Sequence, residues 1–226
     1  AADVIGDSIT LTAFLGTIGM FGNELDINTG TGVLTSSSYL NTYLIETAGD
    51  LRINTVGTGN DYTAFITGPE DILNGLLVTP GSNVTGGKPR LYAGMDIGEA
   101  TNPLFTTVGH IEAFSVAGST WVINEGSLEV GGVASGDAGM RAGGDIYLGA
   151  TSPITITENM ISGVGSVPLG HIVVVARDDS NDTDVDGTST PGTKTDDADF
   201  IRVKDGITVQ STDSYVWLLA GDDVII

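Results

Sequence analysis

The chain has no cysteine and few basic residues. Of its 226 residues, eight are Lys or Arg and 29 are Asp or Glu, so the formal net charge is −21. The absence of cysteine excludes a small secreted domain built around disulfides. The shortage of cations argues against nucleic acids, anionic membrane surfaces and polyanionic substrates as partners, because all of these bind through Lys and Arg.

Long apolar runs and helical periodicity are missing as well. No stretch approaches the roughly 18 apolar residues of a membrane helix. The chain opens on Ala1-Ala2-Asp3 with no basic region of the kind that begins a signal peptide. It ends on the apolar residues Val224-Ile225-Ile226, which we interpret as a mature chain or as a segment of a longer one.

The apolar residues that are present, 40% of the chain, occur mostly in short alternating runs typical of β-strands. In the run Ser8–Ala13, for example, Ile9 and Leu11 are expected to face inward. The continuous run Ile172–Val175 predicts a strand that is buried on both faces. Pro69–Gly75 predicts a single helical turn, because it has Pro near its start and Gly at its end.

One short motif occurs four times between apolar strands. It consists of Ala-Gly, one optional residue and Asp. The first three copies are 45 and 49 residues apart, and the interval before the fourth is longer because an acidic insert at 178–199 falls within it. Glycine permits a sharp corner with positive φ, and the Asp carboxylate is expected to accept hydrogen bonds from neighbouring backbone N–H groups. The predicted corner residues are Gly49 and Asp50, Gly94 and Asp96, Gly143 and Asp145, and Gly221 and Asp223.

A repeat with this spacing predicts a stack of similar units. Periods of about 20–50 residues indicate solenoids, propellers or arrays, and the drift in spacing favours a β-solenoid with loops of variable length. We therefore expect residues 1–226 to form a single parallel β-helix segment, with residues 178–199 as an insert loop. A β-sandwich or jelly roll is the alternative, because Asn74-Gly75, Asp186-Gly187 and Asp205-Gly206 are typical hairpin turns.

Several segments resemble the filamentous-haemagglutinin-like β-strand repeats of large bacterial exoproteins. They are Gly118–Val133, Ala142–Ile146, Ser152–Glu158 and Leu219–Ile225, and the resemblance extends over most of the chain from about Ser8. It implies a right-handed parallel β-helix that is secreted or lies at the cell surface. It also implies a role in adhesion or as an extracellular scaffold.

The acidic insert contains the sharpest candidate for a ligand site. Asp182, Asp184 and Asp186, followed by Gly187, match the first half of an EF-hand-type calcium loop, in which alternate carboxylates converge on one ion. The carbonyl of Thr188 would be a further ligand. Thr193 stands where that loop has its bidentate Glu, and Asp196, Asp197 or Asp199 would have to substitute from further along the chain. The sequence therefore predicts a Ca²⁺ site, with a solvated acidic loop as the alternative.

Catalytic signatures are weak. There is no G-x-S-x-G motif, and His110 and His171 are expected at corners or on the surface. Trp121 and Trp217 are expected to pack against the core, although exposed indole rings would suit sugars. We predict a non-enzymatic extracellular structural or adhesive β-solenoid that stacks on further coils or on copies of itself. The alternative is a secreted carbohydrate-active or carbohydrate-binding β-helix, whose partners would be glycans at a host or cell surface.

Overall fold

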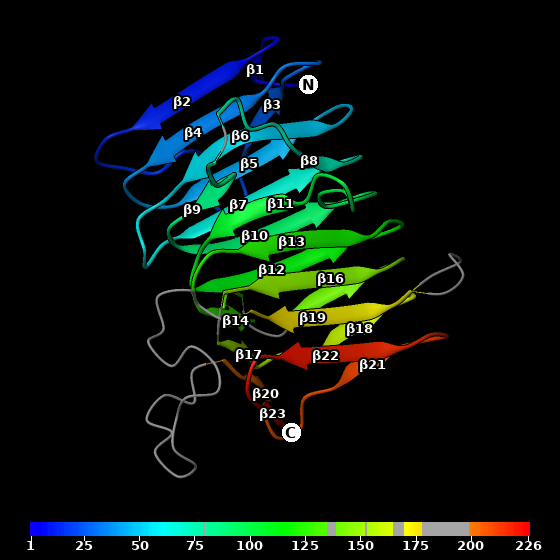
Figure 1. Cartoon of the computed structure of the whole chain (residues 1–226). Helices are drawn as coiled ribbons and strands as arrows, with labels where there is room; N and C mark the ends of the chain where they lie inside the picture. The colour runs from blue at the N-terminus through cyan, green and yellow to red at the C-terminus, as the bar shows by residue number, and fades with distance from the viewer. Residues whose placement is uncertain (79, 135–138, 152, 165–169, 178–198) are drawn as a thin grey trace.

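The computed structural model describes residues 1–78, 80–134, 139–151, 153–164, 170–177 and 199–226. Within these ranges there is no helix, so none is long and apolar enough to cross a membrane. Every named strand belongs to one of two sheets (Figure 1). The all-β prediction is therefore confirmed.

The first sheet contains thirteen strands. Their bounds are β1 Val4–Ile5, β3 Leu25–Asn28, β5 Thr42–Glu46, β7 Thr63–Gly68, β10 Lys88–Ala93, β12 His110–Ser115, β14 Leu128–Val130, β15 Met140–Ala142, β17 Ile154–Ile156, β18 Met160–Ser162, β20 Ile201–Val203, β21 Val209–Ser211 and β23 Val224–Ile225.

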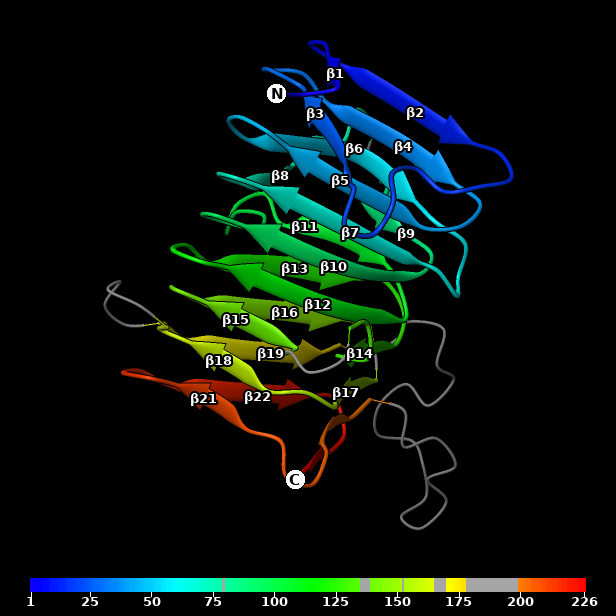
Figure 2. The same ribbon diagram turned by 180° about the vertical axis from the view of Figure 1, so that it is seen from behind.

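The second sheet contains ten strands. Their bounds are β2 Ile9–Ala13, β4 Leu34–Ser38, β6 Leu51–Gly57, β8 Ile72–Asn74, β9 Val84–Thr85, β11 Leu104–Thr107, β13 Thr120–Asn124, β16 Ile146–Ala150, β19 Ile172–Ala176 and β22 Val216–Ala220. The chain passes back and forth between the two sheets and descends one strand at each return (Figures 1 and 2).

All pairings between named strands are parallel. We call the stretch of chain from one strand to its partner in the same sheet a coil. Coils differ in length: Leu104 pairs with Val122, whereas Val56 pairs with Val84, which is further away in the sequence. The coil that contains the insert is the longest, since the insert falls between Met160 and its partner Val209. Among the described residues, the named strands form none of the antiparallel hairpins that the β-sandwich alternative requires.

The core lies between the two sheets and consists of columns of apolar side chains in register. Alternate residues of each strand face inward, which is why the sequence alternates. In the second sheet one such column is Leu104, Val122, Leu148, Val174 and Leu218. All of these except Leu218, in the last strand, are fully buried.

The first sheet divides in its C-terminal half. Strand β12 pairs with β14 through His110 and Ile111, and with β15 through Ala113 to Ser115. Each later coil therefore contributes two short strands to this sheet in place of one long strand. Residues 131–134 follow β14 at this division, and their N–H groups contact the two glutamates described below.

Two local predictions are wrong. Ile72–Asn74 forms β8 and not a helical turn, because Ile72 pairs with Leu51 of the preceding coil and this pairing overrides the local Pro and Gly signals. Strand β19 is buried on one face only: Ile172, Val174 and Ala176 are buried, whereas Val173 and Val175 are half-buried on the outer face.

Candidate functional site

The predicted calcium ligands Asp182, Asp184, Asp186, Thr188 and Asp196 lie outside the described residues. Within the described ranges, no group of three or more His, Cys, Asp or Glu side chains is placed to hold a metal ion. The Ca²⁺ site therefore stays a prediction.

Three of the four predicted corners lie on one edge of the stack. Gly49, Gly94 and Gly143 each connect a strand of the first sheet to the second sheet. Gly221 lies between β22 and β23 and so turns in the opposite direction, from the second sheet to the first. The same short motif thus serves two different edges.

Positive φ is not the common reason for glycine at these corners. Of the four corner glycines, only Gly49 has a positive φ, of 73°. At Gly94 a Cβ atom would lie 2.0 Å from the carbonyl oxygen of Pro69, and at Gly143 it would lie 2.7 Å from the carbonyl oxygen of Val116. At these two corners glycine is required because the backbones of successive coils approach one another closely.

The corner carboxylates connect one coil to the next. The carboxylate of Asp96 accepts a hydrogen bond from the N–H of Ser119, one coil further on, at 2.5 Å. The carboxylate of Asp145 accepts one from the N–H of His171 at 2.8 Å. Asp50 instead forms an ion pair with Arg52 at 3.1 Å. The expected bonds to backbone N–H groups therefore occur at two corners, and they run between coils.

These residues form part of a longer polar column along the same edge. Asp71 accepts a hydrogen bond from the N–H of Asp96 at 2.7 Å, and Ser119 accepts one from the N–H of Asp145 at 3.0 Å. The ring of His171 contacts the Ser214 hydroxyl and stacks on Tyr215. Each of these side chains bonds to a residue of the next coil, so the column stabilises the stack.

Two glutamates lie beneath the loop that follows β14. Glu112 is fully buried and accepts hydrogen bonds from the N–H groups of Val133 at 2.9 Å and Ala134 at 2.7 Å. Its second oxygen lies 3.8 Å from the Arg90 guanidinium. Glu158 accepts a hydrogen bond from the N–H of Gly132 at 3.0 Å. Both carboxylates accept hydrogen bonds from N–H groups of residues 132–134, so we assign both to anchoring this segment.

Burial raises the pKa of Glu112 above its ordinary value. The negative charge of Glu158 adds to the rise, while the Ala134 and Val133 N–H groups and Arg90 oppose it. A raised pKa means that the folded state binds this proton more tightly than the unfolded state does. This contribution to stability is therefore fully present below the ordinary glutamate pKa of about 4.3 and is lost as the pH rises through the raised value.

A Glu112→Gln variant should reveal the loss of stability that comes from ionising the buried Glu112 carboxyl group. The free energy of unfolding of the variant, relative to that of the parent, is expected to increase between pH 4 and pH 7, because the neutral amide never carries the buried charge. Urea unfolding of both proteins at each pH measures the difference. A difference that stays constant or decreases with pH would contradict the assignment.

Aromatic side chains form columns on the outer faces of both sheets. On the first sheet, Tyr43 and Phe65 stack with ring centroids 5.3 Å apart. On the second sheet, Trp121 stacks on Tyr147 at 5.6 Å, and Trp217 lies in the same register further along. The expectation that both tryptophans pack against the core is wrong, because the alternating strand turns their buried neighbours inward and the indoles outward.

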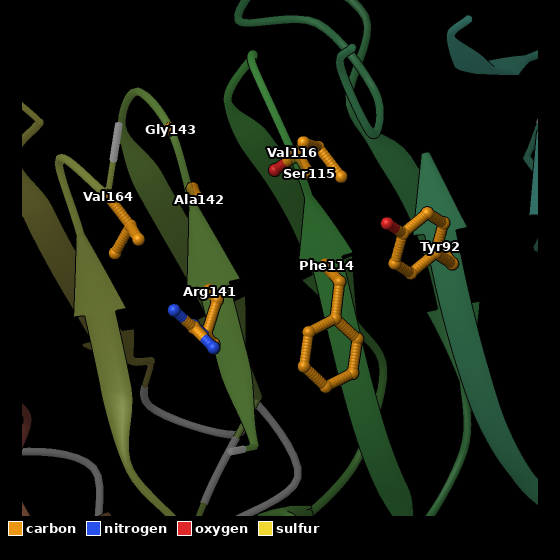
Figure 3. Close-up of a pocket in the computed structure, with 8 residues that line it drawn as sticks. All are labelled: Tyr92, Phe114, Ser115, Val116, Arg141, Ala142, Gly143 and Val164. Atoms are coloured by element: carbon orange, nitrogen blue, oxygen red, sulfur yellow. The ribbon is translucent and has the colours of Figure 1, made fainter. Parts of the chain in front are cut away.

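The outer face of the first sheet is hollowed between β10, β12 and β15. The hollow has a volume of about 240 Å³ and is lined by Tyr92, Phe114, Ser115, Val116, Arg141, Ala142, Gly143 and Val164 (Figure 3). No motif in the sequence gives a sign of it, because its main lining residues are about one coil apart. Only the outward positions of Tyr92 and Arg141 in alternating runs could have indicated it.

Neither histidine belongs to a catalytic arrangement among the described residues. His110 lies 3.2 Å from the carbonyl oxygen of Gly131 and 3.9 Å from the carboxylate of Glu129. His171 belongs to the polar column. Comparison with protein-family models, with curated proteins and with solved structures finds no match to this chain.

Proposed function

We propose that this chain is a non-catalytic structural segment of a right-handed parallel β-helix, to which further coils add at one or both ends. The observation that supports this proposal is that both ends of the two-sheet stack are uncovered. The further coils belong to the same polypeptide or to a second copy.

The C-terminal end exposes side chains that are buried one coil earlier. The inward residues of β19 are buried, whereas their register partners in β22 are only half-buried: Val216, Leu218 and Ala220. Ile226 is 89% exposed. Apolar surface of this kind is stabilised when another coil covers it, at about 25 cal/mol per Å².

The N-terminal end is similar. Leu11 and Ala13 of β2 are half-buried against the core, and Leu15 in the loop after β2 is 86% exposed. The strands at both ends, β1 and β2 above and β22 and β23 below, each have a partner on one side only (Figure 1). Their free N–H and C=O groups are templates for pairing with another strand.

Sedimentation velocity over a range of concentrations tests this proposal. The parent chain is expected to form larger species as its concentration rises. Leu218→Lys places a charge on the inward face of β22, the end strand of the second sheet, and should suppress this association. The control Thr155→Lys places the same charge on the outer face of β17, which has a partner on both sides, and should leave association unchanged. A monomer at every concentration would contradict end-to-end stacking.

The setting that we propose is extracellular or at a bacterial cell surface, with an adhesive or scaffolding role. The resemblance of four segments of the chain to haemagglutinin-like repeats supports this proposal. The acidity of the chain also suits it, since eight Asp residues between 178 and 199 repel one another unless a cation is bound. We propose that this cation is Ca²⁺, held by the insert.

Calcium is expected to raise the thermal unfolding midpoint. A ligand that binds only the folded state adds about 2.7 kcal/mol of stability at one hundred times its dissociation constant. The measurement is thermal unfolding in chelator and in millimolar Ca²⁺, with Asp184→Ala beside the parent. The variant should lose the gain. An unchanged midpoint in the parent would leave the insert as a solvated acidic loop.

A further inference from the structure

The hollow on the first sheet has properties that stacking of coils does not explain. It lies on the side of the stack, away from both ends, so an inference about it is independent of the proposed end-to-end assembly. Its volume of about 240 Å³ is somewhat below that of typical small-molecule pockets, which measure about 300–1,000 Å³. A ligand of this size is about one sugar unit.

One wall of the hollow is aromatic. The rings of Tyr92 and Phe114 are stacked, with centroids 6.4 Å apart and planes inclined by 28°. Tyr92 is 44% exposed, and the half-exposed Val116 extends the apolar surface at the rim. These two rings and Val116 give the wall an apolar surface against which a ligand ring can pack.

The opposite side of the hollow carries a cation. Arg141 is exposed on β15, next to Phe114 in register, and Figure 3 shows its side chain between Phe114 and Val164. Among the residues that the structure describes, Arg141 has no hydrogen-bond or ion-pair partner. In a chain with 29 acidic residues, none of the described residues that line the hollow is acidic.

This combination of charge and surface selects one kind of ligand. A guanidinium binds a carboxylate through two parallel hydrogen bonds, and the aromatic wall packs against an apolar ring face. A uronic acid offers both, since its pyranose ring has an apolar face and carries one carboxylate. A polyanionic glycan is disfavoured, because further carboxylates would meet the strongly negative surface of the protein.

We propose that the hollow binds a single uronic acid residue at the end of a glycan. Arg141 pairs with its carboxylate, and Tyr92 and Phe114 pack against its ring. The site takes the sugar from solvent on the side of the stack, where neighbouring coils leave it accessible.

Calorimetric titration of the full chain tests this proposal. The probes are glycosides that end in glucuronate or galacturonate, each beside its neutral glucose or galactose counterpart, together with benzoate as a flat carboxylate without a sugar. The parent should bind at least one uronide at least tenfold more tightly than its neutral counterpart. Arg141→Gln should remove this preference, and Tyr92→Ala should weaken binding of the uronide at least tenfold.

Arg202→Gln is the matched control, because Arg202 is also exposed on a strand of the first sheet beside an aromatic ring, Phe200. It should bind the uronide like the parent, and unchanged melting curves would show that all variants are folded. Absence of saturable binding up to millimolar uronide would overturn the proposal. So would equal binding of the neutral sugars, equal binding of benzoate, or an equal loss in Arg202→Gln.

Discussion

Gly94→Ala is expected to lower the free energy of unfolding by about 3 kcal/mol, the upper range for forcing extra atoms into a packed site. The new Cβ would lie 2.0 Å from the carbonyl oxygen of Pro69, which belongs to the backbone of the preceding coil. Gly94 also donates a backbone hydrogen bond to Gly68 at 3.0 Å, so the two coils cannot separate without breaking that bond. Chemical denaturation of parent and variant measures the loss.

Two other glycines separate close approach from backbone conformation. At Gly109 no atom lies within 4 Å of a new Cβ and φ is not positive, so Gly109→Ala should be nearly neutral. Gly49 has open space but a φ of 73°, so Gly49→Ala should cost about 1–2 kcal/mol through the left-handed conformation alone. If Gly94→Ala lowered the free energy of unfolding as little as Gly109→Ala does, the close approach of the two coils at Gly94 would be contradicted.

Glu46→Ala is expected to lower the free energy of unfolding by a similar amount, about 3 kcal/mol. It removes a charged acceptor and leaves the buried N–H and hydroxyl groups of Thr29 without a partner. Glu46 is 1% exposed at the end of β5. One carboxylate oxygen accepts hydrogen bonds from the N–H of Thr29 at 3.0 Å and from its hydroxyl at 2.8 Å. The other accepts hydrogen bonds from the N–H groups of Thr47 and Ala48, at 3.2 and 3.4 Å.

Glu46→Gln should fall between the parent and Glu46→Ala. An amide keeps one acceptor oxygen but turns its NH₂ group toward one of the two sets of donors. Glu70→Ala is the control, since Glu70 is an exposed glutamate at a corner and its loss should change stability by less than about 0.5 kcal/mol. Equal unfolding midpoints for Glu46→Ala and Glu70→Ala would show that the hydrogen bonds accepted by Glu46 do not stabilise the fold.

Local patterns in the sequence were sufficient for the all-β class, for many of the strands and for the corners. The alternation in Ser8–Ala13 places Ile9 against the core, and the Ala-Gly-Asp motif marks where the chain changes sheet. The motif did not reveal why glycine is needed. At Gly94 the reason is the carbonyl oxygen of Pro69, which belongs to the preceding coil and becomes a neighbour only when the coils stack.

The features missed were those that depend on register between coils. Pro69–Gly75 has local helix signals, yet the pairing of Ile72 with Leu51 makes it a strand. The hollow on the first sheet joins Tyr92, Phe114 and Arg141, which lie on three different coils and come into register only in the fold. Because coil length varies along the chain, the sequence alone does not show which residues become register partners.

The most direct test of the parallel stack is a disulfide between register partners. The chain has no cysteine, so an engineered pair can form only one intramolecular bond. Thr155 and Arg202 are partners on the outer faces of β17 and β20. Neighbouring strands are roughly 4.8 Å apart, which suits the roughly 4.4–6.8 Å that a disulfide requires between Cα atoms.

The control pair is Glu129→Cys with Arg202→Cys, which lies two strands apart, at roughly 10 Å. The measurement is thiol titration and mass after mild oxidation of the folded protein. The parallel stack predicts that Thr155→Cys with Arg202→Cys loses both thiols and that the control keeps them. Free thiols in the first pair, or oxidation of both pairs to the same extent, would contradict the stack.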